Sequence, residues 1–269
     1  MNDNRIDRTL AELQKNNKKA FITYITAGDP DLETTRKTVL SLDKAGVDII
    51  ELGIPFSDPI ADGPVIQRAV QRSLSGGCTV SGVFEIVKKV RKSITSPIVF
   101  MTYYNIVYRR GVSAFVRDAK RCGADGLIVP DLPLEESDEL LKAASREDFR
   151  VIMLTSPTTS PGRFKKIASV SRGFIYHVSL TGVTGVRNTL SSGLKKDLSR
   201  LKKLSPIPLC VGFGISGPDK AAEVARFADG VIVGSAIIKI IEQNIEKRKE
   251  IPGKVGRFAE KIAAAVHAV

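Results

Sequence analysis

Short runs of apolar and β-branched residues recur along the chain, and a longer segment with apolar positions three or four residues apart follows each run. The runs predict strands at 20–26, 47–53, 97–103, 125–130, 150–155, 173–179, 207–212 and 230–234. The segments between them predict helices at 31–45, 64–93 (broken at Gly76-Gly77), 111–122, 134–147, 160–171, 191–204 and 217–228, and two more follow at 235–248 and 254–268. Nearly continuous apolar strands that alternate with helices indicate a parallel sheet covered on both faces. Eight such units match a (β/α)8 TIM barrel better than a doubly wound sheet, which usually has fewer strands.

A further amphipathic segment precedes the first strand and places Ile6, Leu10 and Leu13 on one face, where they could plug the barrel floor. No linker or change of composition divides the chain. We therefore expect an α/β protein with a single TIM-barrel domain over residues 1–269. It should carry an extra N-terminal helix and an extra short helix after the eighth strand.

An internal repeat singles out one carboxylate. The repeated segments are 45-AGVDIIELG-53, 122-CGADGLIVP-130 and 226-RFADGVIVG-234. When their Asp residues are aligned, Glu51 occupies the position that Ile128 and Ile232 hold in the other two. Side chains alternate along a strand, so all three should point into the barrel. Burying an ionised carboxylate is costly, so Glu51 either has a raised pKa or serves chemistry. A salt bridge to a neighbouring strand is the alternative, but no predicted strand interior contains Lys or Arg.

The loop after the second strand, 53-GIPFSDPIADGP-64, carries Asp58 and Asp62 between prolines that restrict its shape. Barrel active sites lie on the loops that follow the strands, so Asp62 could face Glu51 across the barrel mouth. Two carboxylates in unlike surroundings are a common acid/base arrangement. For either Asp alone, an Asx-turn or a helix cap is the structural alternative.

Histidine offers little for catalysis here. The chain has only His177 and His267, and we expect the second, near the end of the sequence, to lie at the surface. Neighbouring strand residues face opposite sides, so we place Tyr176 inside the barrel, in step with Phe174 and Val178. His177 is then a packed strand histidine, and acid/base work falls to carboxylates.

Three glycine-rich turns follow the sixth, seventh and eighth strands: 182-GVTG-185, 212-GFGIS-216 and 234-GS-235. Glycine lets backbone N–H groups approach an anion closely, and a helix N-terminus attracts phosphate. Because barrel phosphate sites often follow strands seven and eight, these turns predict a small phosphorylated ligand. The segment 180–193 is longer than a minimal connection and could be either a lid or a passive surface loop.

Composition narrows the remaining classes. The chain has 41 Lys and Arg against 29 Asp and Glu, a net charge of +12, but the basic residues lie along amphipathic helices without interleaved aromatic residues. We therefore expect neither nucleic-acid nor membrane binding. No apolar run is long enough to span a membrane, and no secretory signal is evident. Cys78, Cys122 and Cys210 are scattered, which argues against disulfides and a metal site and fits a cytoplasmic protein.

The stretch 47-VDIIELGIPFSDPIADGPVIQRA-69 resembles the signature of the tryptophan synthase alpha subunit family. Further matching segments occur in order along nearly the whole chain: 26-TAGDP-30, 129-VPDLPLEES-137, 182-GVTGVR-187, 212-GFGIS-216 and 234-GSAI-237. The resemblance implies a carbon–carbon lyase of tryptophan biosynthesis. Such an enzyme cleaves indole-3-glycerol phosphate to indole and glyceraldehyde 3-phosphate by a retro-aldol reaction.

The resemblance also assigns roles to residues. It implies that Glu51 is the general acid/base, that Asp62 holds the indole N–H, and that Tyr176 lies near Glu51. Tyr24 and Met101 would line the indole pocket, and Thr184 would contact Asp62 from a lid. The phosphate would be held by backbone N–H groups, those of Gly185, Gly214, Gly234 and Ser235.

A partner is implied as well. Family members dock on a separate beta subunit that carries pyridoxal phosphate, in an alpha2-beta2 heterotetramer, and the alpha subunit itself needs no cofactor. The resemblance places Asp58, Asp131 and Pro133 at that interface, although each could be plain loop structure.

Two features depart from the family. Leu180 stands where some members have an arginine, which bears on lid closure, and the chain is more basic than expected. Three alternatives stay open. The chain could be a free-standing indole-3-glycerol phosphate lyase, or an inactive barrel that only docks on a beta subunit. It could also be a phosphosugar isomerase on the same fold, although this would not explain the long match around Glu51 and Asp62.

Overall fold

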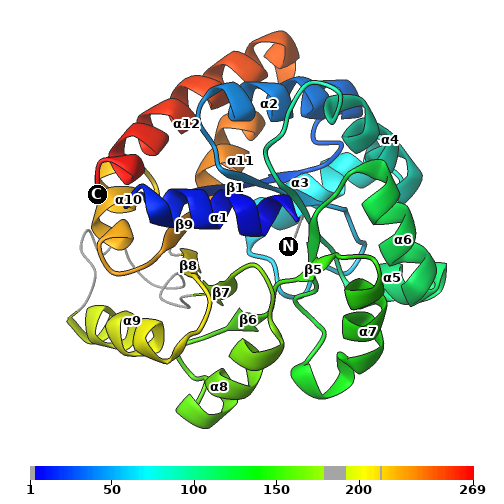
Figure 1. Ribbon diagram of the computed structural model, residues 1–269. Helices are drawn as coiled ribbons and strands as arrows, with labels where there is room; N and C mark the ends of the chain where they lie inside the picture. The colour runs from blue at the N-terminus through cyan, green and yellow to red at the C-terminus, as the bar shows by residue number, and fades with distance from the viewer. Residues whose placement is uncertain (1–3, 179–191, 213) are drawn as a thin grey trace.

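The computed structural model describes residues 4–178, 192–212 and 214–269 and shows parallel strands surrounded by helices (Figure 1). The strands are β1 (Ala20–Thr26), β2 (Ile49–Gly53), β3 (Ile98–Met101), β4 (Gly126–Ile128), β5 (Arg150–Val151), β6 (Leu154–Thr155), β7 (Ile175–Val178), β8 (Leu209–Gly212) and β9 (Gly230–Val233). The helices are α1 (Arg5–Lys15), α2 (Leu32–Lys44), α3 (Pro64–Ser75), α4 (Val80–Val90), α5 (Tyr104–Arg110), α6 (Val112–Cys122), α7 (Asp138–Arg146), α8 (Pro161–Val170), α9 (Ser192–Leu204), α10 (Pro218–Ala225), α11 (Ser235–Glu242) and α12 (Ile251–His267), with 3-10 turns η1 (Leu134–Glu136) and η2 (Ile245–Glu250).

The strand order is β5-β4-β3-β2-β1-β9-β8-β7-β6, so the two outer strands belong to one chain segment, 150–155. Within that segment Ile152 N donates to Leu127 O at 3.0 Å, while Met153 O accepts from Tyr176 N at 3.1 Å. The segment thus joins both ends of the sheet and closes the barrel. The predicted TIM barrel is confirmed, with its fifth strand divided into β5 and β6.

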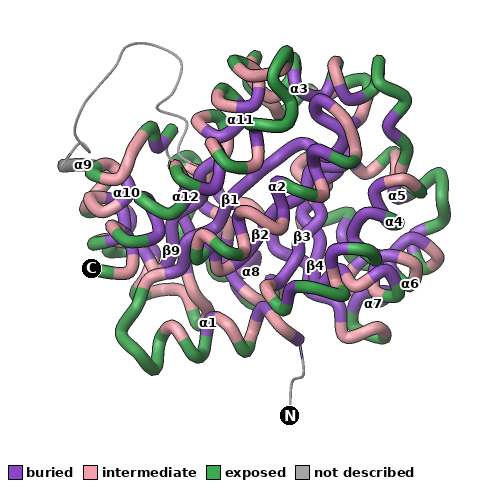
Figure 2. Tube along the Cα trace, turned by 90° about the horizontal axis from the view of Figure 1, so that it is seen from above, coloured by how far each residue is buried: buried purple, intermediate pink, exposed green. Residues whose placement is uncertain are grey.

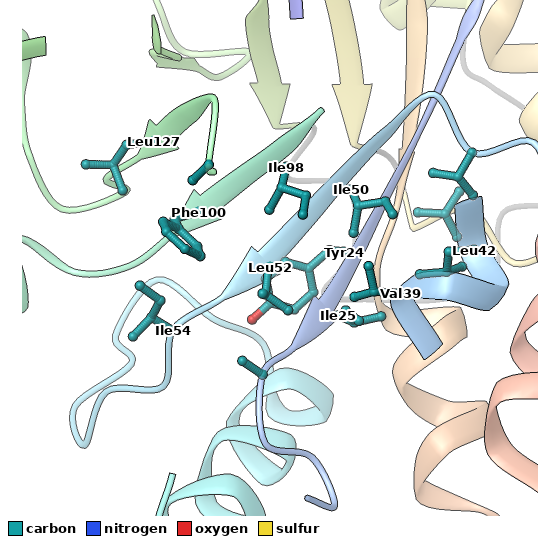
Figure 3. Packing of buried hydrophobic residues seen from close by; sticks show 14 of the residues in the cluster. Tyr24, Ile25, Val39, Leu42, Ile50, Leu52, Ile54, Ile98, Phe100 and Leu127 are labelled. Carbon is teal, nitrogen blue, oxygen red and sulfur yellow. The ribbon is translucent and has the colours of Figure 1, made fainter. Parts of the chain in front are cut away.

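Alternation along the strands separates two apolar layers. Outward-facing Ile50 and Leu52 of β2 pack with the surrounding helices, and Figure 3 shows Val39 and Leu42 of α2 beside them. Inward-facing side chains fill the barrel in a second cluster, and Ile49, at the start of β2, belongs to it. Both faces of these strands are buried away from water, and burial favours apolar side chains. Their sequences are therefore nearly continuous apolar runs.

Helix α1 covers one end of the barrel, while α3 and α11 lie at the opposite end (Figure 2). Its Ile6 and Leu10 are buried among the inward-facing strand residues, and Leu13 packs against them, as predicted. A Cβ at Gly173 would lie 2.9 Å from Ile6, so that glycine leaves room for the plug. With this end closed by α1, the opposite end is where a ligand can enter.

The repeated Asp residues have a structural role. Asp48, Asp125 and Asp229 each accept a backbone N–H at the start of the preceding strand, from Phe21, Ile98 and Leu209 at 2.7, 2.9 and 3.0 Å. This contact links neighbouring strands at the end covered by α1. His267, expected at the surface, is partly exposed, and its Nε2 lies 2.8 Å from Asp48 Oδ2.

Helix bounds differ from the prediction where short elements follow one another. The predicted break at Gly76-Gly77 is confirmed: Gly77 has φ +77°, and the Thr79 side chain caps α4 by accepting from Gly82 N. Helix α5 was not predicted, and its N-terminus is stabilised by Asp131 from a distant loop, which accepts from Tyr104 N at 2.9 Å.

Candidate active site

Glu51 lies inside the barrel at the end opposite α1. It is fully buried on β2, where its register partners are Tyr24 of β1 and Val99 of β3. Among the described residues neither carboxyl oxygen of Glu51 has a hydrogen-bond partner. Burial raises the pKa of Glu51 to about 8, because the charged form loses its hydration without gaining a counter-charge. A protonated carboxylic acid at neutral pH is the expected state.

Two tyrosines share this inner space. Tyr24 is buried, and its hydroxyl lies 3.3 Å from Thr26 Oγ1, whereas Tyr176 packs against the inner apolar cluster. Burial raises the pKa of both phenols, and the negative charges of Glu51 and Asp62 raise each of them further. Both tyrosines therefore lie within electrostatic range of the two carboxylates. Met101, at the end of β3, packs against the same cluster.

Asp62 is held by a tyrosine that the sequence analysis did not single out. The Tyr103 hydroxyl donates to Asp62 Oδ2 at 3.1 Å and accepts from Ala61 N at 2.9 Å. The Tyr103 ring also lies 5.3 Å from that of Phe56, on the same loop. Burial raises the pKa of Asp62 to about 6, although the bond from Tyr103 opposes that shift. Asp62 is thus largely ionised at neutral pH, unlike Glu51.

The helix-cap alternative for Asp62 is not what this geometry favours. The N-cap of α3 is Gly63, which has no side chain to cap the helix, and Pro64 begins the helix. Only the backbone carbonyl of Asp62 supports α3, by accepting from Gln67 Nε2 at 2.9 Å. The Asp62 carboxylate therefore points to Tyr103 and not to the N-terminus of α3. A sequence signal for Tyr103 was absent, because the contact joins residues 41 positions apart.

Glycine turns border the same end of the barrel. A Cβ at Gly234 would lie 3.3 Å from Tyr24, and one at Gly212 would lie 3.0 Å from the Tyr176 ring, so both glycines make room for these tyrosines. Gly214 has φ +49° with open space around it. Exposed Ser235 begins α11, whose first turn has no acidic residue and, within the described part of the chain, no side-chain cap. That N-terminus can attract an anion. Thr184, Gly185 and Leu180 lie outside the described residues.

The three predicted interface residues are all exposed. Asp58 accepts a hydrogen bond from Ser57 Oγ at 2.6 Å, next to Ile60, whose side chain is 82% exposed. Asp131 and Pro133 line a surface pocket. Asp131 also supports the start of α5, so it has a structural role of its own.

Other candidate chemistry is limited. His177 is buried on the outer face of β7 with Nδ1 3.0 Å from Thr155 Oγ1, and burial lowers its pKa to about 4, as suits a packed histidine. Over the described ranges no three His, Cys, Asp or Glu side chains gather as a metal site. No helix in that same part of the chain is long and apolar enough to cross a membrane.

Comparisons with known proteins agree with this geometry. The family model of the tryptophan synthase alpha chain matches residues 10–267. A tryptophan synthase alpha chain from Geotalea uraniireducens is 47% identical over 265 residues, covering 98% of each chain. The crystal structure of tryptophan synthase subunit alpha from Legionella pneumophila has a TM-score of 0.92 at 41% identity over 99% of each chain. The tryptophan synthase complex from Pyrococcus furiosus gives a TM-score of 0.84 at 38% identity, over 92% of this chain and 99% of that one. The likeness extends across the whole barrel, and the chain belongs to the tryptophan synthase alpha chain family.

Proposed function

We propose that this chain cleaves indole-3-glycerol phosphate to indole and glyceraldehyde 3-phosphate, with Glu51 and Asp62 as its catalytic pair. The family membership supports the reaction, and the observation that carries the residue assignment is the fully buried, unpartnered carboxyl group of Glu51. The bond that breaks joins the indole ring to the glycerol carbon that becomes the aldehyde. Because a ring carbon is a poor leaving group, it must first gain a proton.

Glu51 supplies that proton in the proposed mechanism. With a pKa of about 8 it carries a proton at neutral pH, and it can deliver this proton to the ring carbon as general acid. The same carboxylate can then take the proton from the glycerol hydroxyl as the carbon–carbon bond breaks. One proton enters and one leaves, so Glu51 ends the cycle as it began.

Asp62 has the complementary task. Protonation of the ring places positive charge on the indole nitrogen, and an ionised carboxylate beside the N–H stabilises it. The pKa of about 6 leaves Asp62 charged at neutral pH, and Tyr103 orients it. Tyr24, Tyr176 and Met101 would enclose the ring. The phosphate would bind at Gly185, Gly214, Gly234 and Ser235, and Thr184 would contact Asp62.

We also propose that the exposed loop residues Asp58, Asp131 and Pro133 contact a tryptophan synthase beta subunit in an alpha2-beta2 complex. A solved relative is itself a tryptophan synthase complex, and exposed Ile60 beside Asp58 gives this face an apolar contact. Pyridoxal phosphate would belong to the beta subunit, while Glu51 and Asp62 would work without a cofactor. The buried, unpaired cysteines suit a cytoplasmic location.

The test is indole release from indole-3-glycerol phosphate by the purified chain, alone and with a beta subunit, beside Glu51→Gln. We expect weak release alone, stronger release with the partner, and a loss of at least about a hundredfold in the variant. Strong release by the chain alone would favour a free-standing lyase. Binding to the partner without any indole would leave only a docking role and overturn the catalytic assignment.

A further inference from the structure

The two ends of the proposed site stand on different helices. Asp62, at the indole end, lies two residues before Pro64, which begins α3, whereas Ser235, at the phosphate end, begins α11. These helices contact each other and lie together at the end of the barrel opposite α1 (Figure 2). A substrate that spans both ends needs the two helices at one spacing. The bonds that join α3 to α11 therefore bear on how well intact substrate fits.

Arg72 of α3 forms the central bond. Its Nε and Nη2 donate to the two carboxyl oxygens of Asp29 at 2.8 and 2.9 Å, and its Nη1 donates to Glu242 Oε1 at 3.0 Å. Asp29 follows β1 and its side chain is fully buried, while Glu242 is the last residue of α11. One guanidinium thus connects α3, the loop after β1 and α11. Arg is suited to this because its planar fork can serve two carboxylates at once.

Neighbouring contacts strengthen both sides of this bridge. Arg68, one turn earlier on α3, donates from Nε and Nη2 to the two Glu242 oxygens at 2.7 and 3.0 Å. On the other side Ser73 Oγ donates to Ala27 O at 2.5 Å. Arg68 and Arg72 together hold the pKa of Glu242 down at about 2, so Glu242 stays charged throughout the physiological range. The Glu242 side of the bridge therefore stays charged, whereas burial raises the pKa of Asp29 on the other side, although its bonds from Arg72 oppose that shift.

The bridge lies near the C-terminal ends of α3 and α11, whereas the proposed substrate site lies at their N-terminal ends. Arg72 lies eight residues after Pro64, and Glu242 lies seven after Ser235, so each bond is about 10–12 Å along its helix from the site. Because a helix is stiff over two to three turns, a shift at its far end displaces its N-terminus. Arg72 is therefore placed to act through helix position and not by contact with the substrate.

We propose that Arg72 is a positioning residue that sets the spacing between the Asp62 loop and the N-terminus of α11, and thereby the fit of intact indole-3-glycerol phosphate. The inference rests on the proposed function of the site. It predicts that the bridge affects the binding of a ligand that reaches both ends of the proposed site, but not the binding of a ligand that occupies a single end.

The test compares three ligands on Arg72→Lys. Lys keeps the charge but cannot serve Asp29 and Glu242 together. We expect the KM for indole-3-glycerol phosphate to rise roughly tenfold, because small misplacements of reacting groups are costly. Inhibition constants for inorganic phosphate and for indole, which each occupy one end, should change by less than about twofold on the same reasoning. Glu242→Gln, which leaves the Arg72–Asp29 pair in place, should show the same split.

The matched control is Arg36→Lys, because Arg36 makes a similar two-bond contact with Glu33 on the exposed face of α2. Its KM should equal that of the wild type. An unchanged KM in Arg72→Lys would overturn the proposal even if Glu242→Gln raised the KM, because Arg68 would then be the residue that links α3 to α11. Equal weakening of all three ligands would also overturn it, because that result indicates general loosening. The activity of the wild-type chain is measured first, before any variant is compared. If it cleaves no indole-3-glycerol phosphate, the proposed function itself is refuted.

Discussion

An unpartnered acid inside an apolar barrel makes stability depend on pH. The ordinary pKa of glutamate is 4.5, and in the folded chain that of Glu51 is about 8. Between these values the folded protein holds a proton that the unfolded chain has released. The number of bound protons is then larger in the folded state, so stability falls as pH rises through this window. The stabilising contribution is complete below pH 4.5 and lost above about pH 8.

Glu51→Gln removes this titration. The amide has nearly the same shape but no charge, so the variant should gain stability relative to the wild type as the pH rises from 5 to 9. The relative gain is on the order of 4 kcal/mol, since the range from pH 5 to about pH 8 spans three units and each corresponds to about 1.4 kcal/mol. Urea unfolding at several pH values measures it, with Glu85→Gln on the exposed face of α4 as control. Parallel stability curves for Glu51→Gln and wild type would contradict the raised pKa.

Tyr103→Phe tests the second carboxylate. Losing the hydroxyl removes a bond to the ionised form of Asp62, so the pKa of Asp62 should rise above its value of about 6 and less of it will be charged at neutral pH. We expect kcat at pH 7 to fall by about tenfold and the acidic limb of the pH–rate profile to move to higher pH. Tyr108→Phe, on exposed α5, is the control. A lower kcat with an unmoved acidic limb would refute this role.

Sequence and structure agree on Glu51 for a physical reason. Its position could be predicted because the repeat supplies two apolar counterparts, Ile128 and Ile232, and both lie in the inner cluster as expected. Asp62 could be predicted only as a nearby loop carboxylate. The bond from Tyr103 could not, since it depends on where the loop after β3 meets the loop after β2.

At the scale of elements, local pattern predicts strands better than short helices. Strands buried on both faces can be recognised as apolar runs, and all eight predicted strands occur where expected, the fifth as β5 and β6. Helix α5 gives no such signal: its sequence, YNIVYRR, has weak helix formers, and its N-terminus is supported by Asp131 from the loop after β4. The division of the fifth strand at 152–153 likewise follows from closure of the barrel.

A substitution at Asp125 tests how much the Asp links between strands contribute to stability. Its buried carboxylate accepts from Ile98 N at 2.9 Å and pairs with Arg5 at 2.8 Å and Arg91 at 3.2 Å. Asp125→Asn would leave two guanidinium groups without their counter-charge, so we expect a loss of roughly 3–5 kcal/mol of unfolding free energy.

Asp229→Asn is the matched comparison. Asp229 occupies the equivalent position but is partly exposed, with Lys202 at 2.7 Å. Its loss should be about 1 kcal/mol, because solvent screens the charge and Asn can still accept the backbone N–H. Urea unfolding of both variants measures the difference. Equal losses would show that burial of the ion pairs at Asp125 contributes nothing beyond the shared backbone bond.

At the scale of the whole molecule, the contacts that stabilise the barrel and the proposed active site lie at opposite ends. One end is closed by α1 and the Asp links, and α3 and α11 lie at the other end (Figures 1 and 2). The segment that joins β2, which carries Glu51, to α3 contains Asp62. The proposed partner surface and the proposed catalytic loop are continuous, because Asp58 and Asp62 belong to one proline-containing segment. A partner that contacts Asp58 can therefore alter the placement of Asp62 without touching the substrate.

This continuity predicts a separation of effects in Asp58→Ala. Asp58 is exposed and its carboxylate accepts a bond from adjacent Ser57, so the variant should fold normally and keep the basal rate of the isolated chain. Its stimulation by a beta subunit should fall, by at least about tenfold if Asp58 is buried in the complex. Asp131→Ala should differ, because losing the support of α5 also reduces stability. If Asp58→Ala lowered the basal rate and the stimulation equally, Asp58 would act through the Asp62 loop itself, and the partner would have to bind elsewhere.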